Sequence, residues 1–181
     1  MELEKKYRTI VADPPWEYPE GFAFGPGHGR LFKKPLPYPS MTIYEIKELP
    51  VSEIAEKNAR LFLWTTNKWL PNAFDVISAW GFRYRQILVW HKPDANFPSH
   101  IAPNSAEFLL VAIKGKPSCL GKLSSSVFSI TRRGEHSTKP ECFLDFVEQV
   151  SPGPYLELFA RRNRLGWDTW GNQALNHTEA L

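Results

Sequence analysis

The chain has 181 residues, of which 43% are hydrophobic and 14% aromatic, a composition typical of a soluble globular protein with a buried core. The formal net charge of +3 is too small by itself to indicate nucleic-acid binding. The longest apolar runs are too short to span a bilayer and the N-terminus lacks the apolar core of a signal peptide, so we expect no membrane association, a cytoplasmic location and one domain over residues 1–181.

The first predicted element is a buried strand in the stretch RTIVADPPWEY, residues 8–18, where an apolar β-branched run stops at Asp13. Pro14 and Pro15 have fixed φ angles and no N–H, so they form a stiff turn that ends the strand. The turn leaves a carboxylate, two proline carbonyls without opposing donors, and the aromatic face of Trp16. These groups suit a planar partner that offers an NH2 group, such as the edge of adenine. The alternative is a plain strand-ending turn whose tryptophan covers the core.

Predicted helices and strands alternate through the middle of the chain. Residues 17–40 are rich in Gly and Pro and predict a long loop, after which Thr42 and Glu45 form a capping box that opens a short helix. The elements that follow are a buried strand at 60–66, a helix at 71–80, a strand at 84–91, a second loop at 93–105, strands near 107–114 and 126–130, a helix at 140–150 and a strand that begins at 155. This alternation favours an α/β fold with a mainly parallel sheet and ligands at the carboxyl ends of its strands, where Asp13 lies.

The start of the helix at 140–150 carries the motif HSTKPE. Thr138 and Glu141 have the spacing of a capping box, which explains the motif as a purely structural signal. Lys139 would then occupy the first helical turn, where the helix dipole disfavours a cation. A lysine beside unpaired N–H groups could instead hold a carboxylate or phosphate of a ligand.

The last candidate stretch is LELFARRNRLGWDTWGNQ, residues 156–173. Glu157 lies in the middle of the predicted strand and Arg161 at its end. Asn172 and Gln173 offer amides that could pair with hydroxyls or ring nitrogens, although Asn after Gly is also common in ordinary turns.

Other signals are weak or absent. Two cysteines outside any CxxC pair and five scattered histidines predict neither a disulfide nor a metal site. No phosphate-binding loop, GxGxxG motif or Ser/His/Asp arrangement occurs. Three clusters could form local basic patches, although a solvated surface is the simpler explanation for any one of them; they are Arg30, Lys33 and Lys34, then Arg132 and Arg133, and finally Arg161, Arg162 and Arg164.

Taken together, these stretches resemble the MT-A70 family, the DPPW-motif N6-adenine methyltransferases. The resemblance covers nearly the whole chain in the family's motif order, and the last block is closer to the bacterial and phage branch than to the eukaryotic one; the motifs are VADPPW, YPSM, LFLWTT, AWGFRY, EFLLVAIKGKP, EHSTKPE and LELFARRNRLGWDTWGNQ. It implies a Rossmann-like class I methyltransferase fold, with helices on both faces of the sheet and a permuted motif order, and S-adenosylmethionine as methyl donor.

The resemblance also implies roles for individual residues. Asp13 and the carbonyl of Pro14 receive the two hydrogens of the adenine amine, Pro15 completes the catalytic tetrapeptide, and Trp16 borders the base. Lys139 meets the methionine carboxylate of the donor. The remaining cofactor-binding candidates are Asp13, Glu157, Phe159, Arg161, Asn163, Asn172 and Gln173. The substrate-binding candidates are Trp16, Arg30, Lys33, Lys34, Tyr38, Glu107, Arg132 and Arg133.

Two departures from the family pattern concern its loops. Only twelve residues precede DPPW, and the 93–106 loop lacks the glycine-rich pattern and the His-Glu pair of relatives, having Ala106 before Glu107. We expect an N6-adenine methyltransferase that acts on nucleic acid, DNA rather than RNA, working alone, as a homodimer or with a heteromeric partner. RNA methylation and a non-catalytic, nucleic-acid-binding partner subunit are the alternatives.

Overall fold

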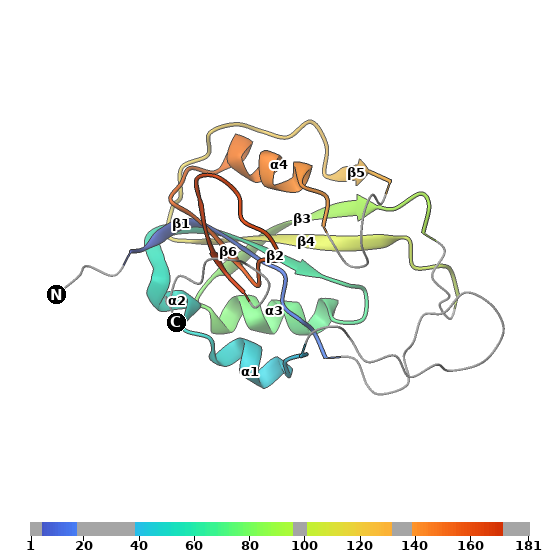
Figure 1. Cartoon of the computed structure of the whole chain (residues 1–181), viewed down its shortest axis with the longest axis horizontal. Coiled ribbons are helices and arrows are strands. Elements are labelled where there is room, and N and C mark those ends of the chain that lie inside the picture. Colours follow the sequence, from blue (N-terminus) through green and yellow to red (C-terminus); the bar gives the residue numbers. More distant parts are fainter. Residues whose placement is uncertain (1–4, 18–38, 96–100, 132–138, 172–181) are drawn as a thin grey trace.

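The computed structural model describes residues 5–17, 39–95, 101–131 and 139–171, which form a seven-stranded sheet with helices on both faces (Figure 1). This confirms the predicted α/β class. The elements in chain order are β1 (Tyr7–Ala12), α1 (Ile43–Glu48), α2 (Val51–Ile54), β2 (Ala55–Thr65), α3 (Leu70–Ala79), β3 (Arg83–His91), β4 (Ala106–Lys114), β5 (Val127–Ser129), α4 (Cys142–Val150), β6 (Tyr155–Leu158) and β7 (Trp167–Trp170).

The strand order is β5-β3-β4-β2-β1-β6-β7, and β4 alone of the described strands runs against its neighbours. The other pairings, β1 with β2, β1 with β6, β3 with β5 and β6 with β7, are parallel. The sheet is therefore mainly parallel, as predicted. Because β4 is reversed, its first residues lie at the edge where the parallel strands end.

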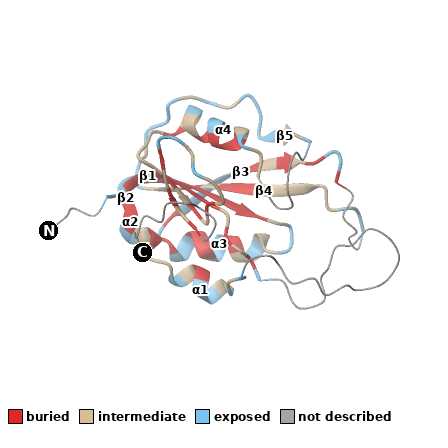
Figure 2. Cartoon of the chain, viewed as in Figure 1, coloured by how far each residue is buried: buried red, intermediate tan, exposed pale blue. Residues whose placement is uncertain are grey.

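Two hydrophobic cores cover the two faces of the sheet, and most of their buried residues lie in the central strands and the inner sides of the helices (Figure 2). Alternate residues of each strand point to opposite faces. Thus Ile10 and Ala12 pack toward α1 and α3, whereas Val11 packs toward α4 with Phe143 and Val147. Burial on both faces explains why these strands are nearly continuous apolar runs.

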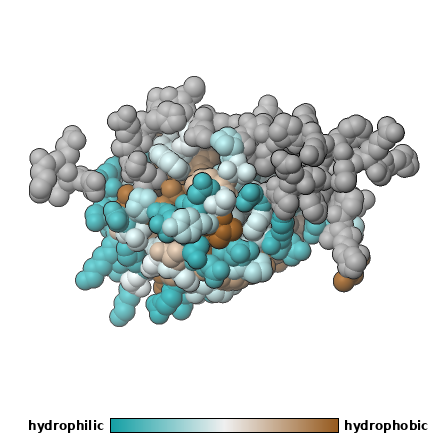
Figure 3. Space-filling model, turned by 90° about the horizontal axis from the view of Figure 1, so that it is seen from below, coloured by the Kyte–Doolittle hydropathy of each residue, from teal (hydrophilic) through white to brown (hydrophobic). Residues whose placement is uncertain are grey.

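The α1 and α3 side presents a mostly hydrophilic outer surface with isolated hydrophobic residues (Figure 3). The predicted capping box at its first helix is confirmed, because the Thr42 hydroxyl accepts from the Glu45 N–H at 3.2 Å while Glu45 accepts from the Thr42 N–H at 2.7 Å. Within the described residues, no helix has both the length and the apolar character needed to cross a membrane.

Three details differ from the predictions. The strand expected at 60–66 begins at Ala55, which pairs with Tyr7 of β1; the register then shifts, and pairing with β1 resumes at Arg60. Two short elements, α2 and β7, were not predicted. The helix expected at 140–150 begins at Cys142 with Glu141 as its N-cap residue, so Lys139 lies before the helix and not in its first turn; Thr138 lies outside the described residues.

Candidate functional site

The DPPW corner begins where β1 ends, with the Asp13 N–H donating to the Leu158 carbonyl of β6 at 3.4 Å. The two proline carbonyls are not without donors, contrary to the prediction. Pro14 accepts from the Trp16 N–H and Pro15 accepts from the Met41 N–H, both at 2.8 Å. A carbonyl oxygen has two lone pairs, so the Pro14 carbonyl keeps the capacity to accept one more hydrogen bond.

Trp16 does not offer the exposed stacking surface that the sequence suggested. Its side chain is 4% exposed and belongs to the core on the α1 and α3 side. The indole stacks on Trp69 with ring centroids 6.3 Å apart, and its N–H donates to the Trp64 carbonyl at 3.2 Å. Burial of a large aromatic ring with its one donor satisfied stabilises the corner. The alternative interpretation, a tryptophan that covers the core, therefore holds for Trp16. Its packing on the α1 and α3 side stabilises the DPPW corner.

Four charged side chains form a continuous chain of ion pairs at the carboxyl edge of the sheet, here called the charge chain: Lys92, Glu107, Lys139 and Asp13. Lys139 Nζ donates to Asp13 Oδ2 at 2.7 Å and lies 3.3 Å from Glu107 Oε2. Lys92 Nζ donates to the other Glu107 oxygen, Oε1, at 2.7 Å. The side chains are only 6% to 21% exposed. Positive and negative groups alternate, so each internal charge faces an opposite one on both sides.

The topology explains why residues so distant in sequence meet. Asp13 follows β1 and Lys92 follows β3, and both strands end at this edge. Glu107 reaches the same edge because β4 runs the other way, and it points to the same face as Leu109 in the core under α4. Lys139 enters just before α4 and lies 5.4 Å from the ring centroid of Trp64. The charge chain therefore lies on the α4 face.

The charge chain sets the pKa values of its central members. Burial alone would raise the pKa of Glu107, but the charges of Lys139 and Lys92 outweigh burial and lower that pKa. Burial alone would lower the pKa of Lys139, but Asp13 and Glu107 raise it well above its usual value. Both side chains are therefore held in their charged forms at neutral pH.

Glu157 lies on β6, directly opposite Val11 of β1. Among the described residues, it is the carboxylate at this edge that has a buried oxygen without a hydrogen-bond partner. Its Oε2 atom is buried and makes no hydrogen bond. Burial, with a further contribution from the charge of Asp13, raises the pKa of Glu157 to about 7. A buried polar atom without a partner is costly unless a ligand supplies one.

The chain turns sharply where β6 ends. Phe159 has a φ of +63°, in the left-handed region that residues other than glycine rarely adopt. The Ala160 N–H donates to the Trp170 carbonyl at 3.1 Å, and a Cβ atom on Gly171 would lie 2.5 Å from the Ala160 carbonyl oxygen. Glycine is required at 171 because the two backbones touch. Backbone strain of this kind concentrates at ligand-binding sites.

The arginine-rich segment after β6 is only partly a positive patch. Arg164 pairs with Asp145 at 2.6 Å and with Glu148 at 2.9 Å, so acidic residues of α4 neutralise its charge. The Asn163 side chain accepts from the Thr169 hydroxyl at 3.2 Å. Arg162 Nη2 donates to the backbone carbonyl of Lys139 at 3.4 Å and so supports the segment that carries this lysine.

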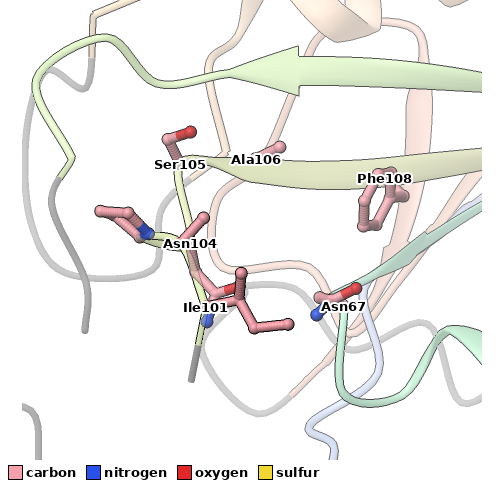
Figure 4. A pocket seen from close by; sticks show the side chains of 8 residues that line it. Asn67, Ile101, Asn104, Ser105, Ala106 and Phe108 are labelled. Carbon is pink, nitrogen blue, oxygen red and sulfur yellow. The ribbon is translucent and has the colours of Figure 1, made fainter. Parts of the chain in front are cut away.

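A pocket of about 460 Å³ opens at the same edge. It lies between the end of β2 and the segment that leads into β4, and its lining includes Asn67, Ile101, Asn104, Ser105 and Phe108 (Figure 4). Phe108 points to the opposite face of β4 from Glu107, because neighbouring strand residues alternate. The pocket therefore lies at the same edge of the sheet as the charge chain but on the opposite face.

The described residues bring together Asp13, Pro14, Glu107, Lys139 and Glu157 on one edge, and they add Lys92, which the sequence analysis missed. Lys92 directly follows a strand, as Asp13 does, and this pattern in the sequence could have identified it. Roles for several other predicted site residues stay predictions, because these residues lie outside the described part of the chain: Arg30, Lys33, Lys34, Tyr38, Arg132, Arg133, Asn172 and Gln173.

The site has groups that fit the sulfonium donor implied by the family resemblance. Lys139 is a cation suited to an amino-acid carboxylate, and the unpartnered Glu157 oxygen is an acceptor suited to hydroxyl groups. Within residues 5–17, 39–95, 101–131 and 139–171, no group of three or more His, Cys, Asp or Glu side chains is placed to hold a metal ion.

Comparisons with known proteins point in one direction. A model of the MT-A70 family matches residues 7–173. The chain is 34% identical to the Type II methyltransferase M.MunI of Mycoplasma sp, over 92% of this chain and 77% of that protein. It is 25% identical to the human N(6)-adenosine-methyltransferase catalytic subunit METTL3, over 93% of this chain but 28% of that protein. It is also 25% identical to the human N(6)-adenine-specific methyltransferase METTL4, of which it spans 39%.

Proposed function

The chain belongs to the MT-A70 family, and we propose that it is an S-adenosylmethionine-dependent N6-adenine methyltransferase that acts on nucleic acid, with DNA as the preferred substrate. One observation carries the proposal. The Asp13 carboxylate is fixed by Lys139 at the end of a parallel strand, next to a proline carbonyl that can accept one more hydrogen bond. These two acceptors match the two hydrogens of the adenine amine.

The corner can activate a weak nucleophile. The lone pair of the adenine amine is spread into the ring, so the nitrogen attacks poorly when it is planar. When Asp13 and the Pro14 carbonyl each accept one amine hydrogen, the nitrogen is favoured in a pyramidal form whose lone pair points at an incoming methyl group. Holding the reacting atoms about 3 to 3.5 Å apart in line then supplies a large part of the rate.

Methyl transfer to the adenine amine needs no strong base before the carbon–nitrogen bond forms. The bound donor would supply a methyl group made electrophilic by its positive sulfur. The amine nitrogen would form a bond to the methyl carbon while the carbon–sulfur bond breaks and leaves its electron pair on sulfur. The methylated nitrogen then carries a positive charge and loses a proton after transfer; Asp13 is the nearest acceptor that the corner provides.

Two residues would hold the donor. Lys139 would bind its amino-acid carboxylate, and the raised pKa of this lysine keeps it charged for that purpose. Glu157 would accept hydrogen bonds from ribose hydroxyls, which would give its buried oxygen a partner. The turn at Phe159, with its φ of +63°, directly follows the end of the strand that carries Glu157.

The preference for DNA rests on the relatives. The chain is 34% identical to the Type II methyltransferase and 25% identical to the human adenosine methyltransferase subunit, and adenosine is a ribonucleoside. A paired base has to leave the stack to reach such a corner. A cytoplasmic location and assembly as a homodimer or with a partner subunit stay predictions.

The test is methyl transfer by the purified protein. The protein is mixed with labelled S-adenosylmethionine and, in separate reactions, with duplex DNA, single-stranded DNA and RNA. We expect label in N6-methyladenine of DNA. Label in RNA alone would shift the substrate class, and donor binding without transfer to any of the three would favour the non-catalytic partner role. Absence of both donor binding and transfer would overturn the proposed chemistry.

A further inference from the structure

We propose that Lys92 is a positioning residue for this reaction: it holds Glu107 so that Lys139 stays directed at Asp13 and remains available for the donor carboxylate. The inference rests on the proposed function for its catalytic meaning. Its structural part, the control of Lys139 by a lysine on another strand, can be measured without activity.

Lys92 is fixed by several contacts. Its N–H donates to the Ser105 carbonyl at 2.7 Å, and its own carbonyl accepts from the Ala95 N–H at 3.0 Å. Its Nζ atom lies 5.1 Å from the centroid of the Trp90 ring, and its side chain is only 6% exposed. A lysine is almost never so buried unless it is paired, and the pairing here is with Glu107.

The two distances at Lys139 show what Lys92 controls. Lys139 Nζ is 2.7 Å from Asp13 but 3.3 Å from Glu107, so the ammonium group favours Asp13. Glu107 has two oxygens, and Lys92 engages one of them at 2.7 Å. Without Lys92, a buried carboxylate would face Lys139 as the remaining cation of the charge chain. Glu107 would then compete more strongly with Asp13 for Lys139.

This competition has a defined consequence at the reaction centre. A lysine drawn toward Glu107 moves away from Asp13, which loses the contact that orients its carboxylate toward the adenine amine. The same lysine is drawn away from the place where it would meet the donor carboxylate. In this proposal the effect of Lys92 on the reaction centre passes through Glu107, to which its Nζ atom donates at 2.7 Å.

The experiment compares Lys92→Met, Lys92→Arg and the double variant Lys92→Met/Glu107→Gln with the wild type. Donor affinity is measured by calorimetry with S-adenosylmethionine, and kcat and KM are measured for DNA. We expect Lys92→Met to weaken donor binding and lower kcat by roughly ten- to hundredfold, the range found for supporting partners of metal ligands. Lys92→Arg should stay within a few-fold of wild type, because the charge is kept.

The double variant separates positioning from plain stability. Removal of the competing carboxylate should restore donor affinity toward the wild-type value, although both members of the ion pair are gone. A purely structural ion pair predicts the opposite, namely a double variant at least as impaired as Lys92→Met. The matched control is Lys114→Met at the other end of β4, a partly buried lysine that donates to the Ser52 carbonyl at 2.7 Å and has no link to the charge chain.

A spectroscopic measurement keeps the structural part independent of activity. The ammonium group of Lys139 should give a protected ¹⁵N signal in the wild type, a shifted or lost signal in Lys92→Met, and a recovered signal in the double variant. An unchanged Lys139 signal in folded Lys92→Met, or unchanged donor affinity, would overturn the proposal. An inactive wild type would refute the proposed function, while the ¹⁵N comparison would still decide whether Lys92 controls Lys139.

Discussion

Asp13 and Glu157 are acidic residues on neighbouring strands of the sheet, at the same edge and on the same face, yet their surroundings differ. Asp13 follows β1 and accepts a hydrogen bond from Lys139 at 2.7 Å. Glu157 lies on β6, two residues before the turn at Phe159, and its buried Oε2 atom has no partner among the described residues. Burial raises the pKa of Glu157 to about 7, so at neutral pH this carboxyl group exchanges a proton readily.

Under the proposed function, this difference lets one edge of the sheet serve two ligands. The paired carboxylate is positioned in advance, so it can accept amine hydrogens without reorganisation. Burial disfavours the charged form of Glu157, whose Oε2 atom has no partner among the described residues, so under the proposed function it suits a ligand that binds and leaves. Among the described residues, Asp13 is paired with a lysine whereas Glu157 Oε2 has no partner, and the proposed function makes the first a fixed acceptor and the second a ligand-dependent one.

The largest effect is expected when the fixed acceptor is changed. Asp13→Asn keeps the shape of the side chain but replaces one oxygen by an NH2 group, which repels the amine it should receive. We expect turnover to fall by about a hundred- to thousandfold, the cost of removing one group that stabilises a transition state. The measurement is methyl transfer to DNA, with the free energy of unfolding from denaturant titration as the control for folding. Turnover close to wild type would refute the role of Asp13.

Removal of Lys139 should leave Asp13 without its cation, as Glu157 Oε2 is already without a partner among the described residues. Lys139→Met leaves Asp13 and Glu107 without the cation between them, and breaking such a buried pair costs about 2 to 4 kcal/mol once partial exposure is allowed for. We expect a lower free energy of unfolding in denaturant titrations and a large loss of donor affinity. Lys114→Met is the control. Unchanged donor affinity in a folded variant would contradict the assignment of Lys139 to the donor carboxylate.

The position of Asp13 at the ligand-binding edge of the sheet was largely predictable from the sequence. An apolar run that stops at an acid and two prolines identifies a strand end, and the alternation of elements places that end at the ligand-binding edge. The sequence predicted that Lys139 could hold a ligand carboxylate or phosphate, and the family resemblance assigned it to the methyl donor. Its predicted place in a first helical turn was wrong, because the helix begins at Cys142. The burial of Trp16 was weighed only as the alternative.

The partners of each charge could not be read from the sequence. Glu107 reaches Lys139 and Lys92 only because β4 is reversed, and an alternating pattern of helices and strands does not reveal one antiparallel strand. Whether a carboxylate is paired or orphaned depends on contacts between residues as far apart as Asp13 and Lys139. The same holds for Lys92, whose interaction with Glu107 joins two strands.

Ionisation of Glu157 should lower the free energy of unfolding as pH rises. The pKa of Glu157 is about 7 in the folded protein against an ordinary value of 4.5, so the folded state binds more protons than the unfolded state between these values. Stability through this group is therefore full below about pH 4.5 and lost as pH rises to about 7, by about 3 kcal/mol. Glu157→Gln should remove this part of the pH slope in denaturant titrations at pH 5 and pH 7. An identical slope in the variant would show that Glu157 does not titrate as its burial requires.

A smaller effect is expected on donor binding. If ribose hydroxyls donate to the ionised Glu157 carboxylate, binding releases a proton below about pH 7, and donor affinity should rise about tenfold between pH 6 and pH 8. Calorimetry at these two pH values, in buffers of different ionisation enthalpy, measures both the affinity and the released proton. Glu157→Gln should bind the donor more weakly at pH 8 and without proton release, because an amide still accepts one hydrogen bond but does not titrate. The amine acceptor Asp13 is left intact in this variant, so proton release that persists in Glu157→Gln would place the titrating group elsewhere and remove the functional distinction between the two acids.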